Sequence, residues 1–568
     1  MNQITSDTAL IDIEHPFKIT AGPGAGKTYW LTEHMRYVLH RSKRLGKIRK
    51  IACITYTNVA VEAILKRMEI SVDRLEVSTI HSFFYKHVVK PYASFIANEF
   101  NLNVKKMDGH DDEILSSYSF LDEWKSKTGQ KRIQDNIEIV NAIRSARWRF
   151  EGEELNFKPD YPMMIKGYPI KNDSYYEYKR MAWERGKVHH DDVLFFSYHL
   201  INKYPFILTI LRAKFPYFFV DEFQDTNPIQ AEIVRLIGQK HTVIGVIGDP
   251  AQSIYGFQGA DLSRFISFTF PGMVDYSMHE NRRSTKTIVN ALNCIRKDIE
   301  QFSVSEVQGE RPVIVIGEMG RAVSHINAKF PGKNVQALTR DNITSNILKR
   351  GVTGVDAIRS LKDELYKSDN PSSSNKYRSL VVISSIEAIE LAREGKFKEA
   401  LVAMEKIFKQ ESNKDRRRAL ALDTIRKLLL GYYSYKDGSL MNFCLFVKDN
   451  IRSEISSFRA GKAKEFYESH TYQQLAVCVN IVEDKSLNKT IHKAKGDEFD
   501  NVLLILKEEK DIQFLLEPDL TSSSNTSEEQ RIYYVAISRA RKNMAISIPA
   551  LDSSKKALLS DQFSIDNV

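Results

Sequence analysis

Cysteine is scarce in this sequence, and long apolar runs are missing. The 568 residues include four cysteines, Cys53, Cys294, Cys444 and Cys478, and no two of them form a CxxC pair. Zinc and iron–sulfur centres are therefore not expected, and free thiols in a reducing compartment are the simpler interpretation. No apolar run approaches the roughly 18 residues that cross a bilayer, and the first residues lack a basic-then-apolar signal segment. The sequence predicts a soluble, cytoplasmic protein without a membrane partner.

Basic residues outnumber acidic ones. Lys and Arg total 82 against 72 Asp and Glu, which gives a net charge of +10. This excess suggests a polyanionic partner such as nucleic acid, although a merely basic soluble protein is the other interpretation. The chain is also too long for one ordinary hydrophobic core, so two or more domains are expected.

The stretch FKITAGPGAGKTYWLTEH at Phe17–His34 combines an apolar run, a glycine-rich turn and a helical pattern. This is the outline of a phosphate-binding loop, in which backbone N–H groups hold phosphate oxygens at a helix N-terminus. Lys27 would reach the β- and γ-phosphates, and the Thr28 hydroxyl would bind Mg²⁺. Ala21 stands where the strict pattern has its first glycine, and an unrelated glycine turn is the alternative. The candidate nucleotide-binding residues of this loop are Gly22, Gly24, Ala25, Gly26, Lys27 and Thr28.

Several apolar runs read as short strands followed directly by polar residues. Continuous apolar runs suit strands that are buried on both faces of a parallel sheet, and ligands bind at the carboxyl ends of such strands. We predict an α/β fold with two parallel sheets, each interrupted by a long, mostly helical segment. The runs are Lys50–Asn58, Pro216–Glu222 and His241–Pro250 for the first sheet, and those near Arg311, Asn334, Asn501 and Met544 for the second.

The strand in PYFFVDE runs into an acidic pair. Asp221 can bind magnesium and Glu222 can orient and deprotonate the attacking water, whereas a helix N-cap followed by a first-turn acid is the alternative without function. The next strand leads into GDPAQSIYGFQGAD, where Gln252 is a candidate sensor of the γ-phosphate. Arg283 and Arg539 would neutralise charge that develops on the γ-phosphate, although either arginine taken singly is typical of a surface residue.

Eight motifs in order carry a family resemblance. They are AGPGAGKT, TYTNVAVEAILKRM, STIHSFF, VDEFQDTNPIQ, GDPAQSIYGFQGA, NRRS, TIHKAKGDEFDNV and EEQRIYYVAISRARK. Their order and approximate spacing, from Ala21 to Lys542, resemble those of the superfamily 1A helicases, the UvrD, Rep and PcrA family. Any one motif is weak, but eight in order leave little room for chance.

The resemblance implies an ATP- and Mg²⁺-dependent DNA helicase that translocates on single-stranded DNA and unwinds it 3′ to 5′. Two RecA-like domains, 1A and 2A, would form the ATP cleft and carry helical insertions 1B and 2B. Arg283 and Arg539 would approach ATP from 2A, Glu498 would meet the ribose, and Arg282 stands where the family has an adenine-stacking Tyr. The implied boundaries are 1–84 and 187–282 for 1A, 85–186 for 1B, 283–350 and 476–568 for 2A, and 351–475 for a reduced 2B.

The same resemblance implies a surface for single-stranded DNA or a single-strand/double-strand junction. Tyr56 and Phe257 keep aromatic rings for base stacking where the family usually has Phe and Trp, and ordinary core packing is the alternative for each ring. The other positions implied to contact DNA are Thr55, Asn58, His81, Ser82, Tyr255 and His492.

Three departures from the family pattern leave alternatives open. No LNxxQ segment precedes the phosphate loop and Gln258 replaces the usual Arg, so selectivity for ATP over other nucleotides is open. The reduced 2B region resembles the helicase-like subunit of Gabija anti-phage systems, which works with an OLD-family nuclease. The chain is then either a helicase of anti-phage defence or DNA repair, or a regulatory ATPase that senses DNA ends and activates a nuclease without processive unwinding. The His189–Asp192 run, HHDD, resembles a metal site, but a structural role is preferred.

Overall fold

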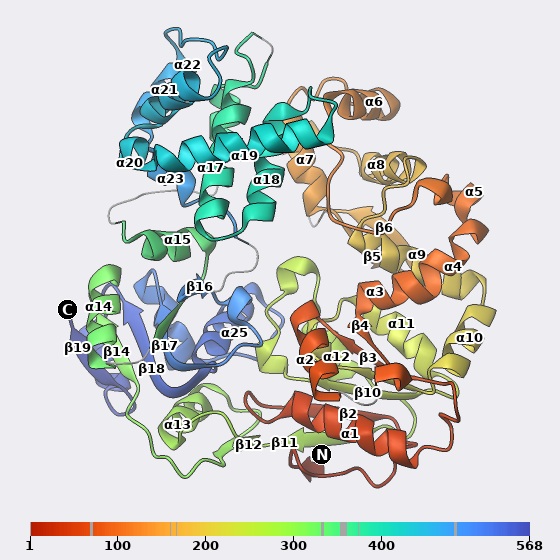
Figure 1. Ribbon diagram of the computed structural model, residues 1–568. Helices are drawn as coiled ribbons and strands as arrows, with labels where there is room; N and C mark the ends of the chain where they lie inside the picture. The colour runs from red at the N-terminus through yellow and green to blue at the C-terminus, as the bar shows by residue number, and fades with distance from the viewer. Residues whose placement is uncertain are drawn as a thin grey trace. The chain divides into compact units, whose positions relative to one another are not determined.

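The computed structural model describes residues 2–68, 72–159, 161–165, 167–330, 334–352, 360–372, 374–481 and 486–568. Its contacts divide the chain into two compact units (Figure 1). The first comprises Met1–Glu310 and Gln513–Lys542, and the second comprises Arg311–Ile512 and Asn543–Val568. Residues 283–310 and 513–542, which the sequence assigns to 2A, thus pack with the first unit; the domain boundaries themselves stay a prediction.

The first unit is built on a seven-stranded parallel sheet, as predicted. Each of the four strands at its centre is buried along its whole length, because both faces of the sheet are covered. On β3, Cys53 belongs to one hydrophobic cluster and its neighbour Ile54 to another. The order across the sheet is β1 (Asn2–Ile4), β11 (Val274–Met278), β2 (Phe17–Ala21), β10 (Val243–Gly248), β9 (Tyr217–Val220), β3 (Ile51–Thr55) and β4 (Leu75–Thr79).

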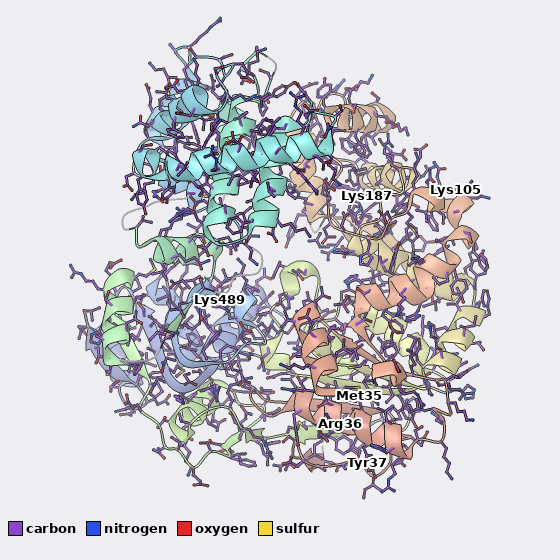
Figure 2. The ribbon with its side chains drawn as sticks, viewed as in Figure 1. Met35, Arg36, Tyr37, Lys105, Lys187 and Lys489 are labelled. Carbon is purple, nitrogen blue, oxygen red and sulfur yellow. The ribbon has the colours of Figure 1, made fainter. Side chains whose placement is uncertain are left out.

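Amphipathic helices cover this sheet. In α1 (Lys27–Arg41), Met35 is fully buried, while the next residue, Arg36, pairs with Glu33 on the outer side (Figure 2). Figure 2 labels Met35, Arg36 and Tyr37 on this helix. The other helices of the first unit outside the predicted insertion are α2 (Asn58–Met68), α3 (Ile80–Phe84), α9 (His190–Lys203), α10 (Phe206–Lys214), α11 (Pro228–Gly238), α12 (Leu262–Ser267), α13 (Lys286–Ile295), α24 (Gln513–Leu516) and α25 (Asn525–Ile537).

The segment predicted as the helical insertion 1B is not wholly helical. It contains an antiparallel hairpin of β5 (Arg147–Glu151) and β6 (Glu154–Lys158), and a second short pair, β7 (Met164–Ile165) with β8 (Tyr168–Pro169). The run RWRF alternates charged and aromatic residues with the period of a strand, and Gly152 supplies the positive φ of the turn. The helices of this segment are α4 (Lys90–Tyr92), α5 (Ala97–Phe100), α6 (Tyr118–Thr128), α7 (Asn136–Ser145) and α8 (Asn172–Glu184).

The HHDD run has the structural role that the sequence favours. The fully buried Asp192 pairs with Lys179 at 2.7 Å and accepts hydrogen bonds from the indoles of Trp148 and Trp183, both at 3.0 Å, and from the His189 backbone. Burial alone would raise the pKa of Asp192, but Lys179 and His189 outweigh it and hold that pKa below its usual range. Among the described residues, no group of three or more His, Cys, Asp or Glu is arranged to hold a metal ion.

The second unit contains the second predicted sheet and a helical segment. In the sheet β14 pairs in parallel with β18 and β19, and β15 pairs in parallel with β16 and β17. Its order is β16 (Asn488–Thr490), β15 (Val335–Thr339), β17 (Phe499–Ile505), β18 (Ala540–Ile548), β14 (Val313–Ile316) and β19 (Ser564–Asn567). The helices beside it in the chain are α14 (Met319–Lys329), α15 (Asn342–Arg350) and α26 (Ser553–Leu559).

The segment predicted as 2B is mostly helical where it is described; residues 353–359 and 373 lie outside the described part. Its strongest helical pattern is divided by Gly395, whose φ is +74°, into α17 (Arg378–Arg393) and α18 (Phe397–Glu405). None of the helices in the described ranges has the length and apolar content to cross a membrane. The others are α16 (Leu361–Ser368), α19 (Lys414–Leu430), α20 (Tyr432–Tyr435), α21 (Leu440–Asn450), α22 (Lys462–Ser469) and α23 (Tyr472–Ala476).

Candidate nucleotide site and nucleic-acid groove

The predicted phosphate loop joins the buried strand β2 to α1. Gly24 and Gly26 have φ values of +70° and +82°, a region that residues with a Cβ rarely adopt. Gly26 caps α1 without a side-chain hydrogen bond, and the first turn of the helix carries no acidic residue. The N–H groups of this turn and the buried Lys27 therefore form a positive cradle that suits phosphate oxygens.

The loop is tightly enclosed by residues in and next to a separate pair of short parallel strands, β12 (Glu280–Asn281) and β13 (Phe302–Ser303). A Cβ on Gly24 would lie 2.7 Å from Asn281 Oδ1, and one on Gly22 would lie 2.3 Å from the Gln301 side chain. The Gln301 Nε2 donates to the Pro23 carbonyl at 3.1 Å, and the Arg282 backbone N–H donates to the Gly24 carbonyl at 2.9 Å. At Gly24, glycine is thus required by the close approach of Asn281 as well as by the backbone conformation.

The acidic pair lies at the carboxyl end of β9. Thr28 Oγ1 is 3.4 Å from Asp221 Oδ2, so the two predicted magnesium ligands lie together. Burial, together with the charge of Glu222, raises the pKa of Asp221 to about 7, despite the opposing effect of Lys27. A buried carboxylate that is short of positive charge, beside a hydroxyl, provides the hard oxygen ligands that Mg²⁺ prefers. These residues fit the predicted cation, and the ion would supply charge neutralisation for a bound triphosphate.

Glu222 adopts a backbone conformation that is rare for a residue with a side chain. Its φ is +54°, and its N–H donates to Asp221 Oδ1 at 3.0 Å. Its carboxylate accepts a hydrogen bond from Gln224 Nε2 at 2.6 Å. Strained residues of this kind persist where the surrounding structure fixes them, and they are concentrated at functional sites.

The structure brings Gln252 and Arg539 together within the first unit. The Arg539 Nη2 donates to Gln252 Oε1 at 2.5 Å. Arg283 lies next to this pair, because its Nη1 donates to the carbonyl of Ser538 at 2.8 Å, the residue before Arg539. Both arginines therefore pack in the same unit as the phosphate loop, although the sequence assigns them to 2A; their assignment to that domain stays a prediction.

Two other predicted nucleotide-binding residues are Arg282, in the first unit, and Glu498, in the second. Arg282 forms ion pairs with Asp7 and with Glu280, the latter at 3.0 Å. Its guanidinium is thus held by two carboxylates, and stacking on a base would require these pairs to rearrange. Glu498 is an exposed residue just before β17 in the second unit. Its contact with a ribose, like that of Arg282 with adenine, stays a prediction.

Three of the predicted DNA-binding aromatics form a short row. The Tyr56 and Tyr255 rings stack with centroids 4.6 Å apart, and Phe257 follows 6.1 Å from Tyr255. The Tyr56 hydroxyl donates to the Gln258 side chain. Phe257 is 60% exposed, which is unusual for a large apolar ring and is the exposure that base stacking needs. This exposure argues against core packing for Phe257, whereas Tyr255 is buried.

The remaining predicted DNA positions are spread over both units. Thr55 is buried at the end of β3, and Asn58 is exposed at the start of α2. Ser82 lies in the first turn of α3, and its N–H donates to Thr79. His81 precedes it, with its ring beside that of His190. His492 lies in the second unit, so its relation to these residues stays a prediction.

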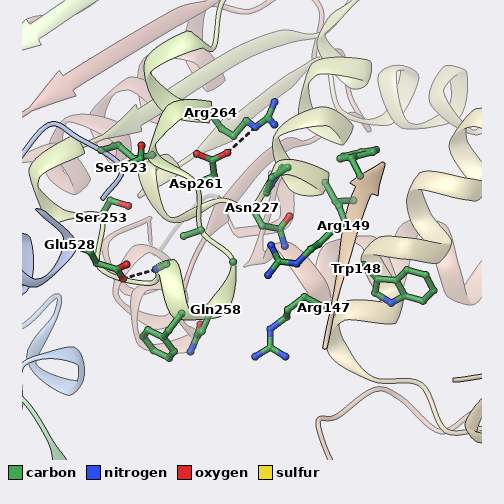
Figure 3. A pocket seen from close by; sticks show the side chains of 18 of the residues that line it. Arg147, Trp148, Arg149, Asn227, Ser253, Gln258, Asp261, Arg264, Ser523 and Glu528 are labelled. Carbon is green, nitrogen blue, oxygen red and sulfur yellow. Dashed lines mark hydrogen bonds and ion pairs between the residues drawn. The ribbon is translucent and has the colours of Figure 1, made fainter. Parts of the chain in front are cut away.

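A cavity of about 650 Å³ opens beside the aromatic row, entirely within the first unit. Figure 3 shows Arg147 and Arg149 projecting from one side of β5 into it, while Trp148 points the opposite way. Phe257 and Gln258 contribute to another part of its lining. We call this cavity the β5 groove.

The charges in the β5 groove are unevenly compensated. Arg264 pairs with Asp261 at 3.2 Å, and Glu528 accepts a hydrogen bond from the Gly256 backbone at 2.9 Å. Among the described residues, Arg147 donates only through Nη1, to the carbonyls of Arg144 and Ala146. Its other N–H donors have no protein acceptor there, which suits contact with a phosphate backbone.

Sequence reasoning did not identify Arg147 and Arg149 as site residues, because the segment was assigned to helix. The period-two alternation in RWRF was the signal that would have placed both arginines on one face of a strand. Gln224 was also missed. It lies inside a recognised motif, but its bonds to Glu222 and to Asp249 depend on the fold.

Comparisons with known proteins agree with this arrangement. Residues 1–270 match the model of the UvrD/REP helicase N-terminal domain, and residues 397–550 match that of the UvrD-like helicase C-terminal domain. The chain is therefore similar to UvrD-like helicases in both its N-terminal and its C-terminal parts. The two parallel sheets found in the units are those expected for the RecA-like domains of this family.

Several individual relatives carry the name ATP-dependent DNA helicase PcrA. The chain is 31% identical over 298 residues to the protein of Staphylococcus aureus, 27% over 298 residues to that of Bacillus subtilis and 29% over 314 residues to that of Staphylococcus epidermidis. These matches cover 51%, 51% and 52% of this chain, and 39%, 38% and 40% of the relatives. The chain thus spans about two fifths of the length of the relatives it matches.

Proposed function

We propose that this UvrD-like chain is an ATP-dependent DNA helicase that translocates on single-stranded DNA in the 3′-to-5′ direction. The observation that carries the proposal is the assembly, within one unit, of a phosphate cradle, an acidic pair and the Gln252–Arg539 contact. The matches to the two UvrD-like helicase domain models support the same activity. ATP and Mg²⁺ are the proposed cofactors, and single-stranded DNA or a junction is the proposed substrate.

On the nucleotide side, each residue has a distinct proposed task. The N-terminus of α1 and Lys27 bind the phosphates, and Thr28 and Asp221 would hold the magnesium ion. Glu222 accepts the proton of the attacking water, and Gln224 orients its carboxylate through the 2.6 Å hydrogen bond. Gln252 and Arg539 contact the γ-phosphate, and Arg283 supports them from the Ser538 carbonyl.

On the DNA side, the short segment from Gln252 to Phe257 would contact both ATP and DNA. Gln252 precedes Tyr255 by three residues, so movement of Gln252 on hydrolysis is transmitted to the aromatic row. The helix α25 joins the two ends of this segment, because Glu528 in its first turn holds the Gly256 backbone and Arg539 follows its last turn. Bases would stack on Phe257, and the β5 groove would bind the phosphate backbone through Arg147 and Arg149.

The proposal is tested by ATP hydrolysis and strand displacement with the purified full chain. We expect hydrolysis that single-stranded DNA stimulates, and displacement from partial duplexes with a 3′ tail but not from those with a 5′ tail. Lys27→Ala serves as the inactive control. Hydrolysis that DNA does not stimulate would overturn the proposal, and displacement from 5′ tails alone would overturn the proposed direction.

A second function is favoured by the state of Arg282. Asp7 and Glu280 hold its guanidinium, so Arg282 is not free to stack on adenine as the resemblance implies. A weaker adenine contact suits slow ATP hydrolysis. The chain would then be a regulatory ATPase that binds DNA ends and activates a partner nuclease of the OLD family, in anti-phage defence. DNA-stimulated hydrolysis without displacement, together with copurification of such a nuclease from the native host, would favour this function over the first.

A further inference from the structure

A buried ion pair lies beside the candidate nucleotide site and has no place in the function proposed so far. Arg296 follows α13, and Asp249 follows β10; their side chains are 1% and 0% exposed. Arg296 Nη1 lies 2.7 Å from Asp249 Oδ1, and its Nε and Nη2 contact both carboxylate oxygens of Asp298 at 2.8 Å and 3.0 Å. Taking such charges out of water is costly, and an apolar pair of the same size would avoid the cost. The pair therefore calls for a role other than stability.

The second oxygen of Asp249 determines how the Gln252 amide is oriented. Asp249 Oδ2 accepts a hydrogen bond from Gln252 Nε2 at 2.5 Å, and Gln252 Oε1 accepts one from Arg539 Nη2 at 2.5 Å. An amide has one donating end and one accepting end, a carboxylate only accepts, and a guanidinium only donates. Asp249 thus fixes the orientation in which the Gln252 oxygen faces Arg539.

The same residue also connects to Glu222. The Asp249 backbone N–H donates to Gln224 Oε1 at 2.9 Å, and Gln224 Nε2 donates to Glu222 Oε2 at 2.6 Å. Gln224 is held with its oxygen toward Asp249 and its nitrogen toward the carboxylate of Glu222. One buried residue therefore orients both amides that contact the proposed site of hydrolysis.

We propose that Arg296 is a positioning residue which, through its ion pair with Asp249, aligns Gln252 with Arg539 and so lets the site distinguish nucleoside triphosphate from diphosphate. The inference rests on the ATP site of the proposed function and names a residue outside every motif of the family resemblance. Without Arg296, the Asp249 carboxylate stays buried with no cation. It then either rotates or draws in water, and in both cases the Gln252 amide loses its fixed partner.

The test compares the Arg296→Met and Arg296→Lys variants with the wild-type full chain. We measure kcat and KM for DNA-stimulated ATP hydrolysis, and the affinities for a non-hydrolysable ATP analogue and for ADP. For Arg296→Met we expect kcat to fall about ten- to hundred-fold, the scale of misplacing a group that contacts the reacting atoms. The affinity for the analogue should fall toward the affinity for ADP. The affinity for ADP should itself stay within about twofold of its wild-type value. Arg296→Lys keeps the charge beside Asp249 and should recover most of both losses.

Two further variants separate positioning from general damage. Arg378→Met removes a comparably buried arginine from its pair with Asp369 in the second unit, so we expect lower stability with kcat unchanged per folded molecule. If Arg296 acts through Gln252, Gln252→Ala combined with Arg296→Met should be no slower than Gln252→Ala alone. Additive losses in that double variant would overturn the inference.

The binding measurement keeps this inference distinct from the proposed function. The ratio of analogue to ADP affinity needs no turnover, so it reports on Arg296 even if the wild-type chain hydrolyses no ATP. Absence of hydrolysis in the wild type, with the ratio still lost in Arg296→Met, would remove the proposed function and support the inference. A ratio in Arg296→Met within about twofold of the wild-type value would overturn the inference, whatever the rate of hydrolysis.

Discussion

His81 makes the stability of the first unit sensitive to acid. Burial, together with the charges of His190 and His110, lowers the pKa of His81 from 6.5 to about 3. Its Nε2 is buried without a hydrogen-bond partner among the described residues. Its ring lies 5.7 Å from that of His190, whose Nδ1 is 2.5 Å from Nδ1 of His110. A proton on His81 would thus be placed in an apolar site beside two other imidazoles.

The direction of the effect follows from the lowered pKa. The unfolded chain binds a proton at His81 below about pH 6.5, whereas the folded protein does not until the pH approaches 3. The contribution of His81 to stability is therefore complete above pH 6.5 and is lost as the pH falls through this window. Each pH unit removes about 1.4 kcal/mol, so lowering the pH from 6.5 to 5.0 removes about 2 kcal/mol.

Urea unfolding followed by tryptophan fluorescence measures this loss, because all four tryptophans, Trp30, Trp124, Trp148 and Trp183, lie in the first unit. In His81→Gln, the difference in unfolding free energy between pH 7.5 and pH 5.0 should be smaller than in the wild type by about 2 kcal/mol. His40→Gln, at an exposed histidine of α1, is the matched control and should leave the difference unchanged.

The charged and aromatic groups that surround His81, His110 and His190 are the same in His81→Gln and in the wild type. Asp112 lies 4.0 Å from His190, and Tyr85 packs beside His110. Half-buried Asp191, near Asp112, has a raised pKa that is caused mainly by its partial removal from water. Equal pH dependence in His81→Gln and the wild type would refute the reasoning, since these other groups are present in both.

Two other predictions concern packing and DNA binding. Lys179→Met leaves the buried Asp192 without its cation and should lower the unfolding free energy by about 3–5 kcal/mol. The double variant Lys179→Met with Asp192→Asn should recover part of this loss. An unchanged midpoint of urea unfolding in Lys179→Met would contradict the prediction. Phe257→Ala should weaken binding of single-stranded DNA by about 1–3 kcal/mol in fluorescence anisotropy, while Tyr168→Ala, at an exposed ring outside the groove lining, should not. Equal affinities of these two variants would exclude stacking on Phe257.

The sequence was a good guide to the strands of both sheets and a weaker one to the first insertion. A continuous apolar run that is followed directly by polar residues, such as that at His241–Pro250, indicates a buried parallel strand. The structure has β10 at this position. The segment containing β5 follows a helix directly, and its alternation covers only five residues. Such a short pattern does not distinguish a strand from the end of the preceding helix. The segment is a strand because it pairs with β6, and local sequence does not reveal this pairing.

For the site, residues inside recognised motifs were predicted and their partners were not. Thr28 and Asp221 are 193 residues apart, yet each belongs to a motif with a known task, and the structure brings them together. The ion pair of Arg296 with Asp249 is equally non-local, but nothing near Arg296 in the sequence indicates a function. Such contacts arise from how α13 packs in the fold, which spacing along the chain does not encode.

The rate of DNA-stimulated ATP hydrolysis by Glu222→Gln tests most directly whether the acidic pair after β9 is the hydrolytic centre. Glutamine keeps the size of the side chain and cannot accept the proton, so turnover should fall about 10²- to 10⁴-fold while ATP and DNA affinities stay within about twofold. Glu232→Gln, on α11 of the same unit, is the control and should turn over normally. Turnover by Glu222→Gln close to that of the wild type would contradict the account.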